Sequence, residues 1–374
     1  MRVSKLKKKN MGQIDYGIFY SVVLLLAVGV VMVYSASSYY AMFKNNDSMY
    51  FLKRQLVWAV LGMIVLCTTM SIDYHKIKKY TLWLMIGCVP LLLVVFLFPG
   101  VNGAQRWIQI GPMSFQPSEL AKYVVVLFLA KSIEMKGDGI KNFSTGIVPY
   151  LFVSGIYAAL VLAEKNLSIA SVIMIVTFIV LFSAGGRIKH LFGIVAPLMV
   201  SAAVIFTVGE PYRRDRMLNF IDPWKDPMGN GYQLIQSFYA LGAGGITGLG
   251  LGQSRQKTLY MPEPHNDFIF AIIGEELGLI GCLCIITLFI VFIWRGIKVA
   301  MSAKDTYGTL LAIGITSVIA VQSLINIAVV TGSMPVTGVP LPFISYGGTS
   351  LVINMAAMGV LLNISRQTEG KKDI

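Results

Sequence analysis

Three carboxylates stand at one end of a very apolar stretch of the chain. Asp267 is followed by Glu275 and Glu276, and the eighteen residues from Leu277 to Trp294 carry no charge. At ~1.5 Å per residue, such a run crosses most of a bilayer core, which places Asp267 near the water boundary. There it could cap the helix that follows, or it could take a proton from a reacting hydroxyl as a general base. The residues alone leave both interpretations open.

The spacing of these carboxylates also suggests how they face. At ~100° per residue, Glu275 lies roughly 80° around a helix from Asp267, and Glu276 points to the opposite side. We therefore expect one glutamate to share a pocket with Asp267 and the other to find a partner inside the helix bundle. Ionisable groups at this depth are costly, and most of them are functional.

A second group of charges precedes the middle of the chain. Arg106 lies in Gly103-Ala-Gln-Arg-Trp, and Glu119 and Lys122 follow in Phe115-Gln-Pro-Ser-Glu-Leu-Ala-Lys122. At a spacing of three, Glu119 and Lys122 would form an ion pair on one helix, which is the structural interpretation. Together with Arg106 they would instead suit an anionic ligand.

A third group is basic and lies between residues 209 and 264. Arg213, Arg214 and Arg216 fall within four residues, and Arg255 and Lys257 follow before Asp267. Guanidinium groups bind phosphate through two parallel hydrogen bonds. The alternative, which is the commoner explanation of such a cluster, is a solvated surface.

The composition requires these groups to be carried by a membrane protein. Of 374 residues, 56% are hydrophobic and only 13% are charged, and the mean hydropathy is +0.71. We attribute the net charge of +13 to an excess of Lys and Arg in the loops on one side of the membrane, and not to nucleic-acid binding. The four cysteines fall inside predicted spans and the three histidines are scattered, so neither a disulfide framework nor a metal-ligand spacing is present in the sequence.

The apolar pattern predicts one all-α domain, residues 1–374, with about ten transmembrane helices. The basic first segment and the apolar run after it are interpreted as an uncleaved anchor. Nineteen of the thirty-one basic residues fall on the same side when both termini (1–15 and 365–374) are cytoplasmic and 209–264 is one large extracellular loop. The expected spans are 16–35, 53–71, 80–98, 115–133, 147–163, 167–184, 190–208, 267–294, 308–331 and 345–364.

Three details qualify this topology. The span 115–133 is the most polar, but without it every later loop would change sides. The Gly-rich apolar stretch 231–252 is too broken to span, so we expect a re-entrant or interfacial segment. Gln322 and Asn326, four residues apart, predict interhelical hydrogen bonds, and 334–350 predicts a rigid, partly inserted loop.

Four motifs in this order resemble the SEDS family (shape, elongation, division and sporulation) of bacterial peptidoglycan polymerases. The first combines the stretches around Arg106 and Lys122 given above, and the resemblance covers nearly the whole chain. The others are Asp226-Pro-Met-Gly-Asn-Gly-Tyr-Gln-Leu-Ile-Gln-Ser237, His265-Asn-Asp-Phe-Ile-Phe-Ala with Gly274-Glu-Glu-Leu-Gly278, and Pro340-Leu-Pro-Phe-Ile-Ser-Tyr-Gly-Gly-Thr-Ser350. Gly274 and Trp224 look more like the division and sporulation branch than the elongation branch. The family often has a proline in the turn that reads Glu164-Lys165-Asn166 here, so the role of this turn is open.

The resemblance implies polymerisation of lipid II at the outer face of the cytoplasmic membrane, with release of undecaprenyl pyrophosphate. Asp267 matches the essential aspartate of the family and would be the general base. Departure of the pyrophosphate needs positive charge or a divalent cation (Mg²⁺ or Mn²⁺), and no organic cofactor is expected. Arg106, Lys122 and Arg216 are the favoured cations. The expected substrate-binding residues are Arg106, Glu119 (orienting Lys122), Lys122, Arg213, Arg216, Lys257, His265, Glu275, Ser345 and Tyr346.

The resemblance also implies a class B penicillin-binding protein, a transpeptidase, as a partner, with other division or sporulation membrane proteins. Two other functions would also suit a protein of this topology. A lipid II flippase would carry polar groups along a path through the membrane, whereas the charges here cluster at the outer end. A non-catalytic scaffold for the transpeptidase would tolerate Asp267→Asn.

Overall fold

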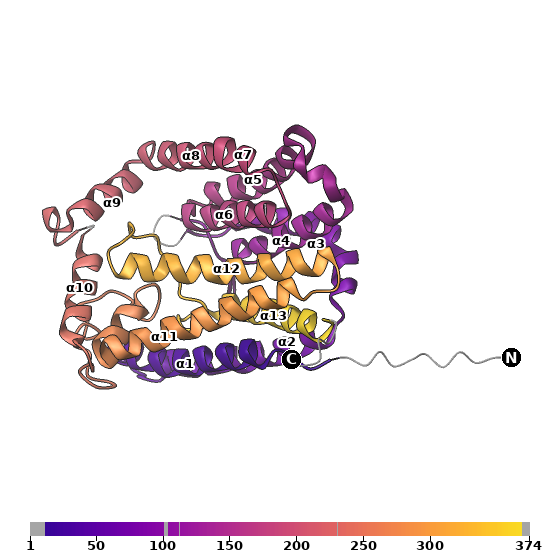
Figure 1. Ribbon diagram of the computed structural model, residues 1–374. Helices are drawn as coiled ribbons and strands as arrows, with labels where there is room; N and C mark the ends of the chain where they lie inside the picture. The colour runs from indigo at the N-terminus through magenta and orange to yellow at the C-terminus, as the bar shows by residue number, and fades with distance from the viewer. Residues whose placement is uncertain (1–11, 101–103, 112, 230, 369–374) are drawn as a thin grey trace.

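The computed structural model describes residues 12–100, 104–111, 113–229 and 231–368. They form a helical bundle whose long helices run side by side (Figure 1). The described helices are α1 (Tyr16–Asn45), α2 (Tyr50–Ser71), α3 (Tyr74–Val94), α4 (Pro117–Lys136), α5 (Val148–Ala163), α6 (Leu167–Ser183), α7 (Ile188–His190), α8 (Ala196–Val208), α9 (Pro211–Ile221), α10 (Tyr232–Gly244), α11 (Ile269–Met301), α12 (Thr306–Val330) and α13 (Gly348–Arg366). Two short antiparallel strands, β1 (Ile108–Ile110) and β2 (Met113–Phe115), precede α4.

The predicted all-α membrane architecture is confirmed. Eight helical segments among the described residues are long and apolar enough to cross a membrane. The predicted span 167–184 falls on α6, which is apolar but shorter, and 115–133 falls on α4, whose first turns carry Glu119 and Lys122. Each predicted span thus coincides with a helix, while the number of crossings and the sidedness of the loops remain predictions.

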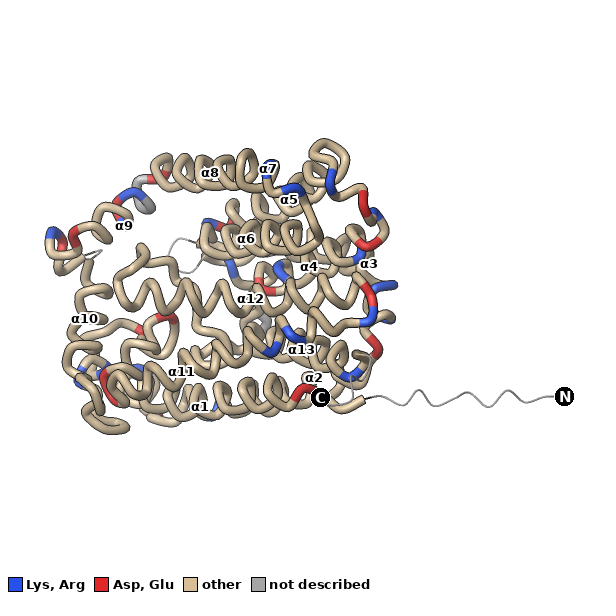
Figure 2. The backbone as a smooth tube through the Cα atoms, viewed as in Figure 1, with Lys and Arg blue, Asp and Glu red and all other residues tan. Residues whose placement is uncertain are grey.

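The bundle has an inner and an outer set of helices. The most apolar windows of α12 and α13 are 72% buried inside the protein, whereas that of the segment Ile188–Val208 is 11% buried. α12 packs against α4, α6 and α11, and α13 packs along α2. Charged residues gather at the two ends of the bundle, and a few lie inside it near α4 (Figure 2). The inner helices therefore position the functional groups, and α8 faces outward.

Polar side chains set where several helices begin. Asp15, Asp73, Asn166 and Asp305 each accept a hydrogen bond from a main-chain N–H in the first turn of α1, α3, α6 and α12 respectively. Such caps satisfy donors that the helix itself leaves free. They fix the ends of the membrane helices, and thereby the turns that carry polar groups.

The region 209–264 is mostly helical only in its first part, up to Gly244. It contains α9, a short 3₁₀ turn and α10, which lie together at one end of the bundle (Figure 1). After α10 the chain runs back along α11 as an irregular, glycine-rich segment. The stretch 231–252, which was predicted as re-entrant or interfacial, therefore comprises α10 and the first part of this segment. The main chain of the segment has a specific partner in the fold.

That partner is a break in α11, which corrects the prediction of one continuous helix over 267–294. Gly278 has φ 67° and ψ −166°, so α11 is two helical pieces joined at this residue. The carbonyls of Glu275 and Glu276 accept from the N–H groups of Leu249 and Gly250, both at 3.0 Å. On the other side of the break, Leu279 N–H donates to Gly245 O at 2.9 Å and Ile280 N–H donates to Ile246 O at 3.2 Å. The glycine-rich segment thus satisfies the main-chain groups that the break exposes, as a helix break at membrane depth requires.

Candidate active site

Asp267 lies two residues before α11 begins, where three segments meet. Its carbonyl oxygen accepts a hydrogen bond from Nδ2 of Asn326 at 2.7 Å, and the same nitrogen donates to the carbonyl of Val339 at 2.8 Å. Asn326 is four residues from the end of α12, which is about one helical turn, or ~6 Å. The prediction that Asn326 bonds between helices is wrong, because both of its partners are main-chain carbonyls of segments that are not helical. Asp267 is thereby fixed close to one end of the bundle.

The carboxyl group of Asp267 does not cap α11. The N-cap position is Phe268, and no side chain accepts a hydrogen bond there. Oδ2 of Asp267 instead lies near Gly338, where a Cβ atom would stand 3.7 Å away. Gly338 has φ 72°, a conformation that favours glycine. Of the two interpretations of Asp267, the structure excludes the cap.

The surroundings of Asp267 tune its acidity. Burial raises the pKa of its carboxyl group, the negative charge of Glu263 adds to this rise, and Arg216 opposes it. Arg216 comes from α9, and its Nη1 donates to the carbonyl of Val336 at 3.2 Å. A partly accessible carboxyl with a raised pKa and a nearby guanidinium suits a proton acceptor beside an anionic group.

His265 and Tyr346 belong to one aromatic cluster with Phe51 and Tyr40. The ring centroid of His265 lies 4.2 Å from that of Phe51, 5.8 Å from that of Tyr40 and 5.7 Å from that of Tyr346. The N–H of Tyr346 donates to the carbonyl of His265 at 3.0 Å. Burial, with a further effect of Lys44, lowers the pKa of His265 to about 4, so its ring is neutral at pH 7. The cluster holds the segment before Asp267 against the segment before α13.

Ser345 is used inside its own loop. Its Oγ accepts a hydrogen bond from the N–H of Leu341 at 2.8 Å, and its N–H donates to the carbonyl of Leu341 at 3.0 Å. The side chain is buried. The structure therefore gives Ser345 the role of closing the turn that leads to α13.

Glu119 and Lys122 form the predicted ion pair within α4. The Nζ–Oε2 distance is 2.9 Å, and the side chains are 2% and 0% exposed respectively. Ser350, at the start of α13, donates to the same Oε2 at 2.6 Å. The pair is confirmed, and Glu119 and Ser350 hold Lys122 inside the bundle.

Arg106 is directed to a different partner. It donates from Nε to the carbonyl of Glu164 at 3.4 Å and from Nη2 to the carbonyl of Lys165 at 2.6 Å. These carbonyls belong to the turn between α5 and α6. Arg106 therefore holds this turn, and this contact was not anticipated from the sequence.

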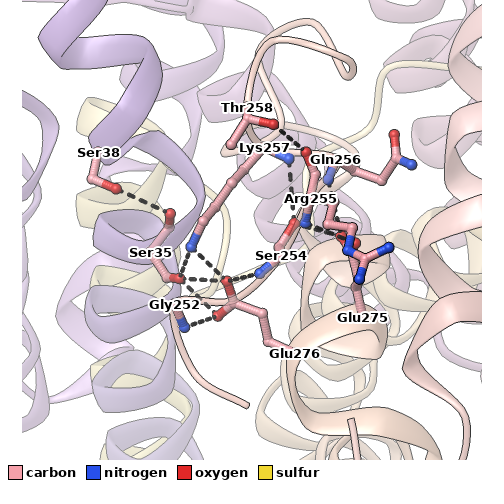
Figure 3. Close-up of polar contacts among 10 residues, drawn as sticks. All are labelled: Ser35, Ser38, Gly252, Ser254, Arg255, Gln256, Lys257, Thr258, Glu275 and Glu276. Atoms are coloured by element: carbon pink, nitrogen blue, oxygen red, sulfur yellow. Dashed lines mark hydrogen bonds and ion pairs between the residues drawn. The ribbon is translucent and has the colours of Figure 1, made fainter. Parts of the chain in front are cut away.

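Glu275 and Glu276 bind the loop 252–257 (Figure 3). Glu276 accepts from the main chain of Gly252 and Ser254, from the hydroxyl of Ser35 at 2.7 Å, and from Nζ of Lys257 at 2.8 Å. Glu275 accepts from the hydroxyl of Ser254 and from the N–H groups of Arg255 at 2.9 Å and Gln256 at 3.4 Å.

These contacts correct the expectation that Glu275 opens into the pocket of Asp267. Both oxygens of each carboxylate are used to tie the loop to α1 and α11. Lys257 likewise pairs inside the protein, with 8% of its side chain exposed. Glu276 has found the bundle partner that its position on the helix required. Arg213 lies on α9, and its side chain is outside the part of the chain that the structure describes.

Lys257→Met is expected to destabilise the protein by about 3–5 kcal/mol, because the Glu276 carboxylate would remain buried without its cation. The matched control is Lys53→Met. Lys53 pairs with Asp47 at the same 2.8 Å, but the two side chains are 64% and 39% exposed, so its loss should cost less than about 1 kcal/mol. Thermal unfolding of the purified protein in detergent measures both variants. Equal shifts would show that the Lys257 pair does not hold the loop.

One groove in the described part of the chain is separate from Asp267. It has a volume of about 760 Å³ and lies between the C-terminal half of α1 and the loop 251–258. Tyr34, Tyr39 and Gln253 are among its lining residues, and Asp267 is not. We assign no chemistry to the groove, because the perturbed carboxyl and the guanidinium lie elsewhere.

Among the described residues, no group of three or more His, Cys, Asp or Glu side chains could hold a metal ion. A divalent cation near Asp267 would need most of its oxygen ligands from a bound substrate, as Mg²⁺ often does beside phosphates. The described side chains therefore do not by themselves form a metal site, and we derive no step through one.

The sequence did not point to several groups that complete this region. Gly338 leaves space beside Asp267, Ser350 anchors Glu119, and Glu164 is fully buried in the turn that Arg106 holds. Gly338 stands in a segment rich in proline and glycine, which was a signal for a special backbone. No pattern in the sequence indicated that Ser350 or Glu164 would be buried.

Comparison with known proteins gives matches over most of the chain. A family model described as "Cell cycle protein" and covering FtsW, RodA and SpoVE matches residues 16–370. Stage V sporulation protein E of Bacillus subtilis is 46% identical over 347 residues, 92% of this chain and 94% of that protein. A probable peptidoglycan glycosyltransferase FtsW of Geobacter metallireducens is 42% identical over 370 residues, 98% of both chains.

Solved structures match as well. One belongs to work on polymerization and crosslinking by a peptidoglycan synthase complex, with a TM-score of 0.78, 28% identity, and coverage of 94% of this chain and 98% of that chain. The rod shape determining protein RodA of Thermus thermophilus has a TM-score of 0.71 and 24% identity, with coverage of 96% and 98% respectively, and supports the fold alone.

Proposed function

This chain belongs to the FtsW/RodA/SpoVE family and is a peptidoglycan glycosyltransferase of division or sporulation, and we propose that Asp267 is its general base. The substrate is lipid II, and the reaction takes place at the outer face of the membrane. The observation that carries this proposal is the position of Asp267: its carboxyl has a raised pKa and lies near Arg216 and Gly338, and its carbonyl is bound by Asn326 of α12.

In the proposed reaction, the 4-hydroxyl oxygen of one lipid-linked sugar attacks the anomeric carbon of another. A C–O bond forms, and the bond from the anomeric carbon to the pyrophosphate breaks, with its electron pair passing to the leaving oxygen. Asp267 accepts the proton of the attacking hydroxyl, which requires an approach of ~2.6–3.2 Å. Undecaprenyl pyrophosphate leaves, and the sugar chain is one unit longer.

Arg216 is the cation that we assign to the departing pyrophosphate. It is close enough to Asp267 to lower its pKa, and it is carried on α9 at the same end of the bundle. Positive charge placed where negative charge develops stabilises the transition state. Lys122 is a weaker candidate because its amino group is buried and paired with Glu119. Arg106 is a weaker candidate because its guanidinium lies at the α5–α6 turn and is not among the charges that act on the Asp267 carboxyl.

The expected partner is a class B penicillin-binding transpeptidase. The similarity to a peptidoglycan synthase complex that couples polymerization and crosslinking supports this assignment. Joining strands and cross-linking them are successive reactions on the same polymer, so a complex of the two activities is chemically reasonable. Other division or sporulation membrane proteins would bind the same assembly.

Arg216→Ala is expected to lower kcat/KM for lipid II by about tenfold to a hundredfold, since hydrogen bonds to a charged group contribute about 1.5–3 kcal/mol. The measurement is glycan polymerisation from purified lipid II with the transpeptidase present. Arg214→Ala is the matched control, because Arg214 lies on the same helix and its side chain is exposed. Unchanged turnover in Arg216→Ala would remove the pyrophosphate role. Absence of product from the wild-type protein would favour the flippase or the scaffold.

A further inference from the structure

A buried carboxyl group outside the proposed chemistry stands at the end of α5. Glu164 has no exposed surface, and neither carboxyl oxygen has a hydrogen-bond partner of good geometry. Burial raises the pKa of Glu164 to about 8, against the opposing effects of Ser118 and Arg106. An ionised carboxylate without partners is very costly inside a protein. Its burial, its lack of well-aligned hydrogen-bond partners and its raised pKa all indicate that the Glu164 carboxyl is uncharged at neutral pH.

The contacts of Arg106 agree with an uncharged Glu164. Arg106 approaches this residue, yet it donates to the main-chain carbonyls of Glu164 and Lys165. A guanidinium next to an ionised carboxylate forms the stronger charge-assisted pair. The guanidinium of Arg106 therefore holds the turn as long as the side chain of Glu164 carries no charge.

The turn that Arg106 holds is connected to Asp267. Asn166 caps α6 through the N–H of Ile169 at 3.3 Å, and the hydroxyl of Ser168 donates to the carbonyl of Thr337 at 2.6 Å. Thr337 precedes Gly338, the residue beside the Asp267 carboxyl. A displacement of the turn would therefore move the loop that borders the reacting group.

We propose that Glu164 is a positioning residue of the glycosyltransferase: its uncharged carboxyl leaves Arg106 on the α5–α6 turn, and the turn holds the loop beside Asp267. The inference rests on the proposed role of Asp267. It gives the turn Glu164-Lys165-Asn166 a function. When Glu164 loses its proton, Arg106 moves toward the carboxylate, the turn shifts, and the reaction slows.

Other groups around Glu164 do not replace it in this role. Cys88 faces it from α3 and Ser118 from the first turn of α4. Glu119 and Lys122, farther along α4, are paired with each other. Within the described residues Arg106 is the cation whose field acts on Glu164. The ionisation of Glu164 consequently acts on the turn through Arg106.

The test compares polymerisation between pH 6 and pH 10 in wild type, Glu164→Gln and Glu164→Ala, each with its transpeptidase partner. Wild-type activity should fall above pH 8, by about tenfold at pH 9, because one unit above a pKa about a tenth of the group remains uncharged. Glu164→Gln, which is neutral at every pH, should lack this fall and restore the pH 7 activity that Glu164→Ala loses. Glu210→Gln, at an exposed glutamate between α8 and α9, is the matched control and should follow the wild-type profile.

Infrared difference spectra give a readout that does not depend on turnover. Subtracting Glu164→Gln from wild type should show the carbonyl band of a protonated carboxylic acid, which disappears above pH 8. Identical pH profiles for wild type and Glu164→Gln would overturn the positioning role, and absence of the band would overturn the uncharged state. If Asp267→Asn keeps full activity while the band titrates as expected, the role of Asp267 fails and the charge state of Glu164 stands.

Discussion

Asp267→Asn is expected to abolish glycan synthesis from lipid II, with a loss of at least about a hundredfold. A positioned general base contributes about 10²–10⁴ in rate, and the asparagine amide cannot accept the proton of the attacking hydroxyl. The change is nearly isosteric, so the hydrogen bond from Asn326 to the carbonyl of residue 267 should persist. Purified protein with its transpeptidase partner should show product from the wild type and none from a folded variant that still binds the partner.

The matched control for Asp267→Asn is Glu263→Gln. Glu263 is exposed, and its charge helps to raise the pKa of Asp267. Its removal should leave turnover largely intact and move the pKa of Asp267 downward. Equal product from wild type and Asp267→Asn would exclude Asp267 as the base.

The raised pKa of Asp267 determines in which direction the acid limb of the pH–activity profile is shifted. The base must be ionised to act, and burial disfavours the ionised form. Activity should therefore decline at a higher pH than an ordinary aspartate would give, and Glu263→Gln should shift this decline toward lower pH.

Gly278→Ala is expected to prevent the protein from accumulating in folded form, or to lower its melting temperature strongly. Gly278 has φ 67°, where a side chain costs about 1–2 kcal/mol. An added Cβ would also stand 2.4 Å from the nitrogen of Gly248 and 2.5 Å from the carbonyl oxygen of Ile246. Both atoms belong to the segment that pairs with the break in α11, so neither can move without losing hydrogen bonds.

The matched control is Gly155→Ala. Gly155 lies within α5, and an added Cβ would meet no other atom within 4 Å. Alanine is favoured over glycine in a helix by about 1 kcal/mol, so this variant should be neutral or slightly stabilising. Yield in the membrane and thermal unfolding in detergent compare the two. If Gly278→Ala accumulates and melts as Gly155→Ala does, the break in α11 does not depend on glycine.

The sequence by itself determined the membrane architecture and the family. Long apolar segments in a bilayer must satisfy their main chain internally, so hydropathy alone predicts helices at the right places. The ion pair of Glu119 and Lys122 was also predictable, because a spacing of three on a helix brings two side chains together. The motif containing Asp267 identified the residue on which the proposed chemistry depends.

The tertiary structure decided which charges meet. Helical spacing says nothing of a break, and at Gly278 the chain departs from a helix so that a distant glycine-rich segment can bond with it. Glu275 and Glu276 consequently bind the loop 252–257 (Figure 3), although the spacing had suggested that Glu275 shares a pocket with Asp267. Lys257 forms an ion pair there with Glu276.

The same limit applies to Arg106 and Glu164. The two carbonyls that Arg106 binds belong to residues 58 and 59 positions farther along the chain. Burial of the Glu164 carboxyl depends on how α3, α4 and α5 pack around it. The local sequence pattern determines which residues form a helix, because the hydrogen bonds within a helix join residues that are near neighbours in the chain. The charge state of a buried group depends on solvent exclusion and on partners from several elements, and only the assembled bundle supplies both.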